Sequence, residues 1–149
     1  MNDISFSVIV ADDQPFYLKG FCSALEKRGD CKQIITAVNG EQLIRAALES
    51  KPQLILVDII MPIINGIQAT RVLKEEMPEV KIVGLALYQP ERLIEKFMAA
   101  GADGYLFKNC DAVTFNEAIE EVMYKTGKYC QLNNTDQNNE QTFMGLELF

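Results

Sequence analysis

The chain contains no histidine, and its basic residues are outnumbered by acidic ones, so that its net charge is −7. This charge argues against a nucleic-acid surface on the chain itself, because binding to phosphate backbones needs clustered Lys and Arg side chains. The four cysteines lack C-x-x-C spacing, and without histidine they do not form an ordinary zinc ligand set. We therefore interpret them as reduced packing residues.

Long apolar segments are also missing. The opening residues, MNDISFSVIV, carry no basic leader, and no apolar stretch approaches the length of a membrane span. We therefore expect a cytoplasmic protein. With 149 residues, of which 48% are hydrophobic, the chain can form one ordinary domain with a continuous core, together with a tail.

One pattern occurs five times, a short apolar run followed by a longer stretch with helical periodicity. The runs are FSVIVA at 6–11, QIITAV at 33–38, LILVD at 54–58, KIVGLA at 81–86 and GYLF at 104–107. After the first run, Leu18, Phe21 and Leu25 have the spacing of one buried helix face. Strands that are apolar on both faces and alternate with amphipathic helices predict a doubly wound α/β fold, in which helices cover both faces of a parallel sheet.

Charged residues follow several of these predicted strands. Asp12 and Asp13 end the first strand, Asp58 ends the third, and the fifth runs into Lys108. In such sheets the ligand site lies outside the carboxyl ends of the strands. Taken singly, each Asp has a structural explanation as a loop or capping residue. Together, three carboxylates at one edge repel one another unless a cation screens them, and oxygen ligands of this kind suit Mg²⁺.

The acidic pair also narrows the chemistry of the site. A flavin or dinucleotide site needs a glycine- or hydroxyl-rich turn after the first strand, whereas ADDQP places two negative charges there. A phosphate could enter only with a metal ion that neutralises it. An aspartate can itself accept a phosphoryl group while a metal ion bridges the reacting oxygens, and Lys108 could neutralise further charge. The pattern therefore indicates phosphoryl transfer.

Four segments carry a resemblance to a known family. In this order and spacing, VIVADDQP, LILVDIIMPIING, GLALYQP and AAGADGYLFKN resemble the receiver domain of bacterial two-component response regulators. The opening DDQPFYLKGF resembles the NarL/FixJ type, whose receivers usually precede a LuxR-type helix-turn-helix domain. The resemblance implies a flavodoxin-like fold with five parallel strands in the order 2-1-3-4-5. It also implies a receiver domain at 1–125 and a polar linker or tail at 126–149.

Carried over position by position, the resemblance assigns roles to the charged residues. Asp58 would be the phosphoacceptor, which receives its group from the phosphohistidine of a sensor kinase. Asp13 would be the principal metal carboxylate and Asp12 would assist it. Ile60, two residues beyond Asp58, would lend its backbone carbonyl to Mg²⁺, and Lys108 would contact the phosphoryl oxygens.

Two further positions concern the switch that phosphorylation would drive. Tyr105 matches the aromatic residue whose rotamer follows activation. The alternative is that Tyr105 is a half-buried strand tyrosine with a structural role only. Ala86 stands where the family usually has Ser or Thr, whose hydroxyl bonds the phosphoryl group. The lost bond is worth roughly 1.5–3 kcal/mol, comparable with the gap of a two-state switch. We expect phosphorylation to stay possible while its coupling weakens or is rerouted, unless Tyr88 or a backbone amide compensates.

The end of the chain has a different composition. Between residues 131 and 141 it is rich in Asn and Gln, which is typical of a linker, and it then finishes on the apolar segment FMGLELF. That segment either opens a second domain or docks on the first as a tail. The resemblance favours the first alternative.

Three functions remain open from the sequence. The leading one is a phosphoacceptor domain that controls a DNA-binding effector domain in transcription, with a histidine kinase as partner and a homodimer as the family expectation. The second is a stand-alone or degenerate receiver that binds proteins regardless of phosphorylation. The third is a phosphatase of the haloacid-dehalogenase kind, but that family has an acidic residue where Ile60 stands. We expect no enzyme beyond Mg²⁺-dependent self-phosphorylation and slow self-dephosphorylation.

Overall fold

One parallel sheet forms the centre of the molecule, for which a computed structural model describes residues 5–88 and 90–131. Its strands are β1 (Phe6–Ala11), β2 (Cys31–Ala37), β3 (Leu54–Asp58), β4 (Lys81–Ala86), β5 (Gly104–Phe107) and β6 (Tyr129–Cys130). They lie in the order β2-β1-β3-β4-β5-β6. The helices are α1 (Pro15–Glu26), α2 (Gly40–Ser50), α3 (Gly66–Glu76), α4 (Glu91–Ala99) and α5 (Ala112–Tyr124). In the part of the chain that the structure describes, none of these helices has the length and apolar character needed to span a bilayer.

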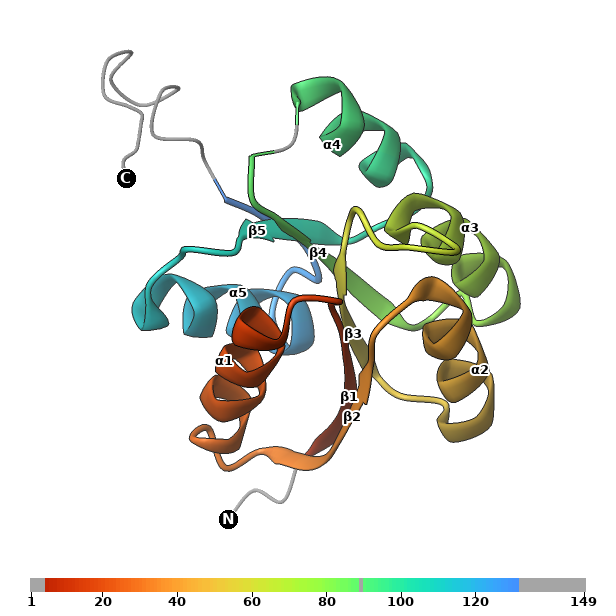
Figure 1. Ribbon diagram of the computed structural model, residues 1–149. Coiled ribbons are helices and arrows are strands. Elements are labelled where there is room, and N and C mark those ends of the chain that lie inside the picture. The colour runs from red at the N-terminus through yellow and green to blue at the C-terminus, as the bar shows by residue number, and fades with distance from the viewer. Residues whose placement is uncertain (1–4, 89, 132–149) are drawn as a thin grey trace, which may run out of the picture.

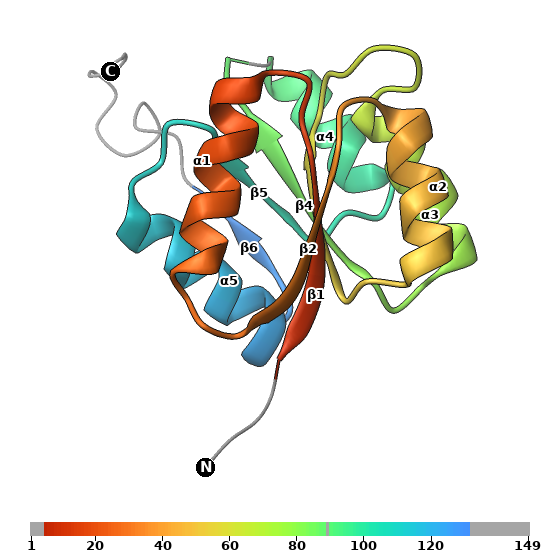
Figure 2. The same ribbon diagram turned by 60° about the horizontal axis from the view of Figure 1, so that its bottom comes forward.

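The helices form two layers, one on each face of the sheet. Helices α1 and α5 cover one face, and α2, α3 and α4 cover the other (Figures 1 and 2). Successive residues of β1 serve the two layers in turn, so that Val8 and Val10 pack with Phe21 of α1, whereas Ile9 packs with Leu43 of α2. Both faces of the inner strands are therefore buried, which explains their continuous apolar runs. The predicted doubly wound fold and the order 2-1-3-4-5 are confirmed.

The sheet has one strand more than the sequence predicts. Strand β6 pairs in parallel with the outer edge of β5, where the Tyr129 amide donates to Asp103 O at 3.1 Å and the Gln131 amide donates to Tyr105 O at 3.1 Å. An uncovered edge would leave these backbone groups of β5 without a strand partner. Two residues are too few to show strand periodicity in a sequence. Residues 132–149, which include the apolar segment FMGLELF, lie outside the described residues.

The loop after β3 is fixed by the start of α3. Asn65 caps this helix by accepting a hydrogen bond from the Gln68 amide, and the Gln68 side chain accepts one from the Asn65 amide in return. Gly66 is required here because a Cβ at this position would collide with the carbonyl oxygen of Asp58. The helix can therefore begin directly against the end of β3, which holds the loop that follows Asp58 close to the sheet.

Candidate functional site

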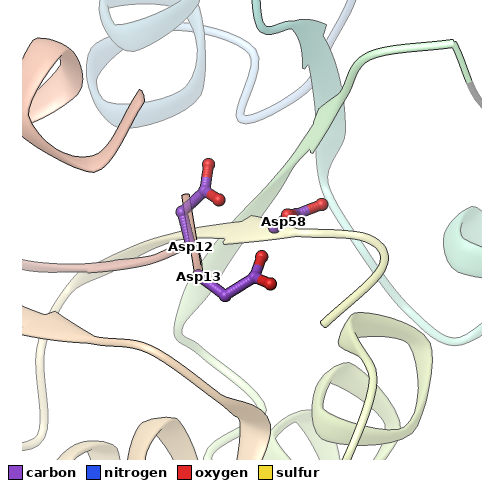
Figure 3. A group of neighbouring side chains, drawn as sticks. All are labelled: Asp12, Asp13 and Asp58. Carbon is purple, nitrogen blue, oxygen red and sulfur yellow. The ribbon is translucent and has the colours of Figure 1, made fainter. Parts of the chain in front are cut away.

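Four charged residues predicted from the sequence meet at one edge of the sheet. Asp12 and Asp13 directly follow β1, Asp58 is the last residue of β3, and Lys108 directly follows β5. Figure 3 shows the three carboxylates gathered where the ends of β1 and β3 lie side by side, with one oxygen from each within 4.8 Å of the others. Asp12, Asp58 and Lys108 are buried, whereas Asp13 is exposed. The predicted convergence is therefore present in the structure.

The ammonium group of Lys108 is the hub of this cluster. Its Nζ donates to Asp12 Oδ1 at 3.1 Å, to Asp58 Oδ2 at 3.0 Å and to Gln14 Oε1 at 2.7 Å. The side chain of Lys108 is only 2% exposed, and its Nζ lies 4.8 Å from the centre of the Tyr17 ring. The backbone is fixed as well, because the Lys108 amide donates to Ala86 O at 2.7 Å. The structure therefore presents an almost fully enclosed cation.

Asp58 is held at both carboxylate oxygens. Its Oδ1 accepts a hydrogen bond from the Ile60 amide at 3.0 Å, and its Oδ2 accepts one from Lys108. Burial raises the pKa of Asp58, Lys108 partly opposes this rise, and the charge of Asp12 adds to it, which leaves the pKa at about 6. Burial lowers the pKa of Lys108, but the two carboxylates outweigh it and the net pKa lies above the ordinary lysine value. The cluster is thus short of positive charge.

The carboxylates suit a hard divalent cation. Asp12 Oδ2 is fully buried and lies 2.9 Å from Lys108 Nζ, but among the described residues it lacks a partner in hydrogen-bond geometry. Asp13 is exposed, and one of its oxygens lies within 4.8 Å of oxygens of Asp12 and Asp58. Three carboxylates that share one lysine would be stabilised by a further cation, and oxygen ligands are those that Mg²⁺ prefers. The donor set therefore fits the metal predicted from the sequence.

The two predicted switch positions lie on neighbouring strands of the sheet, β4 and β5. Ala86, the last residue of β4, is fully buried and pairs with Phe107. Tyr105 is half-buried in β5, with its ring 6.0 Å from that of Phe107. Tyr88, which the sequence offered as a replacement for the missing hydroxyl, is 74% exposed. The structure places these residues, and what they do in switching remains a prediction.

Sequence reasoning missed Gln14 as a site residue. Gln14 directly follows the acidic pair and precedes Pro15, which is the first residue of α1. Its amide donates to Asp12 Oδ1 at 3.0 Å, and its side chain is the shortest contact of Lys108. The position of Gln14 directly after Asp12 and Asp13 could have marked it as a site residue. Its contact with Lys108 could not be predicted from the sequence, because 94 positions separate the two residues.

Comparison with known proteins gives consistent relatives. The transcriptional regulatory protein LnrK of Bacillus subtilis is 35% identical over 115 residues, which cover 77% of this chain and 52% of LnrK. The transcriptional regulatory protein DegU of Brevibacillus brevis is 30% identical over 122 residues, which cover 82% of this chain and 52% of DegU. A LuxR-family two-component response regulator from Aurantimonas sp. SI85-9A1 has the same fold, with a TM-score of 0.79 at 24% identity and coverage of 89% and 94%.

These matches also define the family. The chain spans about half the length of the curated relatives that it matches. The LuxR-family structure, at 24% identity, supports the fold. Residues 8–120 match the family of response regulator receiver domains, which is most of the chain. The chain therefore belongs to the receiver domains of two-component response regulators.

Proposed function

We propose that this receiver domain accepts a phosphoryl group on Asp58 from the phosphohistidine of a sensor histidine kinase. The observation that carries the proposal is the position of the Asp58 carboxylate, which lies 3.0 Å from Lys108 Nζ and shares its edge of the sheet with Asp12 and Asp13. A nucleophile, a fixed cation and two further carboxylates for a metal ion are the parts that phosphoryl transfer needs.

The transfer places defined demands on these residues. One carboxylate oxygen of Asp58 forms a bond to phosphorus while the nitrogen–phosphorus bond of phosphohistidine breaks, and the electron pair of that bond returns to the imidazole. The Ile60 amide orients the carboxylate through Oδ1. Lys108 stabilises the charge that the phosphoryl oxygens bring, and because it is buried this interaction is screened little by solvent. In self-dephosphorylation, water attacks phosphorus, the bond between the Asp58 oxygen and phosphorus breaks, and inorganic phosphate leaves while the Asp58 carboxylate is regenerated.

A magnesium ion fits the proposed reaction. Asp12, Asp13 and Asp58, together with the backbone carbonyl of Ile60, would hold it. When bound, the ion supplies positive charge to the carboxylates and to the phosphoryl oxygens. Without added charge, the buried carboxylates oppose the approach of an anionic phosphoryl donor.

The output of the domain is proposed from its relatives. Both sequence relatives are described as transcriptional regulatory proteins, and the chain matches about half of each. We therefore propose a receiver domain at 1–125 and a polar linker or tail at 126–149, of which residues 129–131 pair with β5. We further propose that a DNA-binding effector domain outside this chain acts on transcription. Contact with DNA would be made by that domain, and phosphorylation would act through self-association of the receiver.

Incubation with acetyl phosphate and Mg²⁺, followed by intact mass and a mobility-shift gel, tests the proposal. We expect one phosphoryl adduct in the parent protein, none in Asp58→Asn, and none when EDTA removes the metal ion. Asp111→Asn is a matched control, because Asp111 caps α5 by accepting from the Thr114 amide and asparagine caps equally well. An adduct in Asp58→Asn, or none in the parent protein, would contradict the proposal.

A second function has one observation in its favour. Ala86 removes the hydroxyl donor that would bond the phosphoryl group, as expected of a domain that binds partners regardless of phosphorylation. Intact mass separates the two, since the second function predicts no adduct. Sedimentation with and without the phosphodonor should then show unchanged self-association. Steady release of phosphate from unrelated monoesters would instead indicate a phosphatase.

A further inference from the structure

The ammonium group of Lys108 has no free donor hydrogen in this structure. A lysine ammonium carries three N–H groups and no acceptor. In the described residues Lys108 Nζ has three side-chain partners, Asp12, Asp58 and Gln14. A phosphoryl oxygen that arrives on Asp58 can bond Lys108 only if one of these partners gives up its hydrogen.

Gln14 is the partner that can leave at the lowest cost. Asp12 is charged and buried, and its charge-assisted bond to Lys108 is stronger than a bond to a neutral amide. Asp58 loses its own carboxylate charge in the acyl phosphate, but the phosphoryl oxygens that compete for Lys108 are attached to it. Gln14 is neutral and exposed, so that water replaces Lys108 as its partner when the side chain turns outward. Asp12 is further restrained because it also accepts from the Gln14 backbone amide, at 3.0 Å.

Gln14 does not use its side chain to stabilise the start of α1. It is the N-cap residue of α1, but its side chain makes no capping hydrogen bond. Ser, Thr, Asn or Asp would cap the helix better. The backbone of Gln14 is extended, and Pro15 is the first residue of the helix. The Gln14 side chain bonds Lys108 and not the helix amides.

We propose that Gln14 is a positioning residue that occupies the third donor hydrogen of Lys108 in the unphosphorylated domain and yields it to a phosphoryl oxygen when Asp58 is phosphorylated. This inference rests on the proposed function. The exchange replaces one hydrogen bond by another, and no proton is transferred. Because the phosphoryl group must displace Gln14, the glutamine lowers the affinity of the site for the phosphoryl group and favours the return of Lys108 after hydrolysis.

Titration of the full chain with beryllofluoride and Mg²⁺, followed by ¹⁹F NMR, tests the exchange. Beryllofluoride stands in for the phosphoryl group on Asp58. In Gln14→Ala we expect binding to be tighter by about three- to tenfold, since a hydrogen bond of ordinary net strength no longer competes. In Gln14→Glu we expect weaker binding than in the parent protein, because the new carboxylate holds Lys108 more firmly and repels the anion.

Two measurements distinguish this role from a structural one. Gln33→Ala, an exposed glutamine change on β2, is the matched control and should bind as the parent protein does. Before beryllofluoride is added, the ¹⁵N resonance of the Lys108 ammonium in Gln14→Ala should differ from that in the parent protein. In the parent protein this resonance should shift only when beryllofluoride is added. Thermal unfolding should show that each variant is folded, as expected for an exposed position.

Defined outcomes overturn the inference. If Gln14→Ala binds beryllofluoride no more tightly than Gln33→Ala, or more weakly, Gln14 does not compete for Lys108. In that case the phosphoryl adduct on Asp58 would still form, and the proposed function would stand. If the parent protein neither binds beryllofluoride nor accepts a phosphoryl group, the proposed function fails and this inference fails with it.

Discussion

Asp58 illustrates how a functional residue opposes the stability of its own fold. Asp58 is 4% exposed, and burial raises its pKa more than the Lys108 ammonium lowers it. An acid whose pKa is higher in the folded state than in the unfolded state contributes least stability when it is ionised. The charge that phosphoryl transfer needs is therefore held at a cost in folding free energy.

Replacing Asp58 by asparagine should stabilise the metal-free domain at neutral pH. The shift from the ordinary aspartate pKa of 3.8 to about 6 corresponds to about 3 kcal/mol at pH 7. This cost is absent below pH 3.8, grows between pH 3.8 and about 6, and is constant above that. Urea unfolding of Asp58→Asn and the parent protein in EDTA should give free energies of unfolding that diverge between pH 4 and pH 7. A constant difference would contradict the assigned pKa.

Restoring a hydroxyl at position 86 should strengthen the response to phosphorylation. Ala86→Thr places a donor at the end of β4, whereas Ala86→Val has the same shape without it, so that the pair isolates the hydrogen bond. Both changes overpack a fully buried site and should cost roughly 1–3 kcal/mol of stability. In sedimentation with beryllofluoride, we expect Ala86→Thr to self-associate more than Ala86→Val. Equal association would show that Ala86 does not weaken the coupling.

At the scale of elements, β6 shows how the chain covers an edge that the α/β repeat leaves open. The strand approaches β5 so closely that a Cβ on Gly104 would collide with the carbonyl oxygen of Tyr129. Beyond the two paired residues, the side-chain oxygen of Gln131 accepts from the Phe107 amide at 2.8 Å. The contact therefore reaches the residue that precedes Lys108, and residues 129–131 are attached to the strand that ends at the site.

Gly104→Ala should release β6 from the sheet. The added methyl group forces the Tyr129 carbonyl away, and we expect a loss of roughly 1–3 kcal/mol in the free energy of unfolding. Hydrogen exchange at the Gln131 amide, which donates to Tyr105 O, should become faster. Gly20→Ala in α1 is the control with the opposite sign, because nothing lies within 4 Å of its Cβ and alanine favours a helix by up to about 1 kcal/mol. Undiminished protection at Gln131 would contradict this account of β6.

At the scale of the whole molecule, Arg28 joins the turn after α1 to α5. Its guanidinium donates to Asp30 Oδ2 and to Glu120 Oε2, each at 2.8 Å, and the Tyr124 hydroxyl also donates to Asp30 at 2.8 Å. The Arg28 side chain is 8% exposed. The partner side chains are more exposed, Asp30 at 21% and Glu120 at 47%. The pair with Asp30 is the better buried one, and a buried, hydrogen-bonded pair contributes more than an exposed surface pair. This cluster ties the two helices of one layer together beyond their apolar contact.

The Arg28 cluster should lose its contribution in acid. Burial raises the pKa of Asp30, but the hydrogen bonds from Arg28 and Tyr124 outweigh it and hold the pKa below its ordinary value. Stability from this carboxylate is therefore present above about pH 4 and lost as the pH falls through the folded-state pKa. Asp30→Asn should cost about 1–3 kcal/mol at pH 7 and little at pH 2 in urea unfolding. Glu41→Gln, in the exposed pair with Arg45, should change little at either pH.

The predictable part of the fold followed from hydrophobic periodicity. Strands buried on both faces gave continuous apolar runs, and the five helices gave buried stripes, so that the layers agree with the prediction from periodicity. The strand order agrees with what the family resemblance implies. The boundaries of β2 differ from the prediction, because the strand runs over Cys31–Ala37 and not 33–38. Its residues are partly exposed at the edge of the sheet, which weakens the apolar signal. Strand β6 had no such signal at all.

The sequence by itself determined the fold class and the convergence of Asp12, Asp13, Asp58 and Lys108, because parallel strands bring their carboxyl ends to one edge. Only the tertiary structure decided that Gln14 completes the contacts of Lys108 and that Asp58 has a pKa of about 6. Packing of the folded chain brings together hydrogen-bond partners that are far apart in the sequence, and it removes water from the Asp58 carboxylate. The local periodicity of the sequence predicts neither effect.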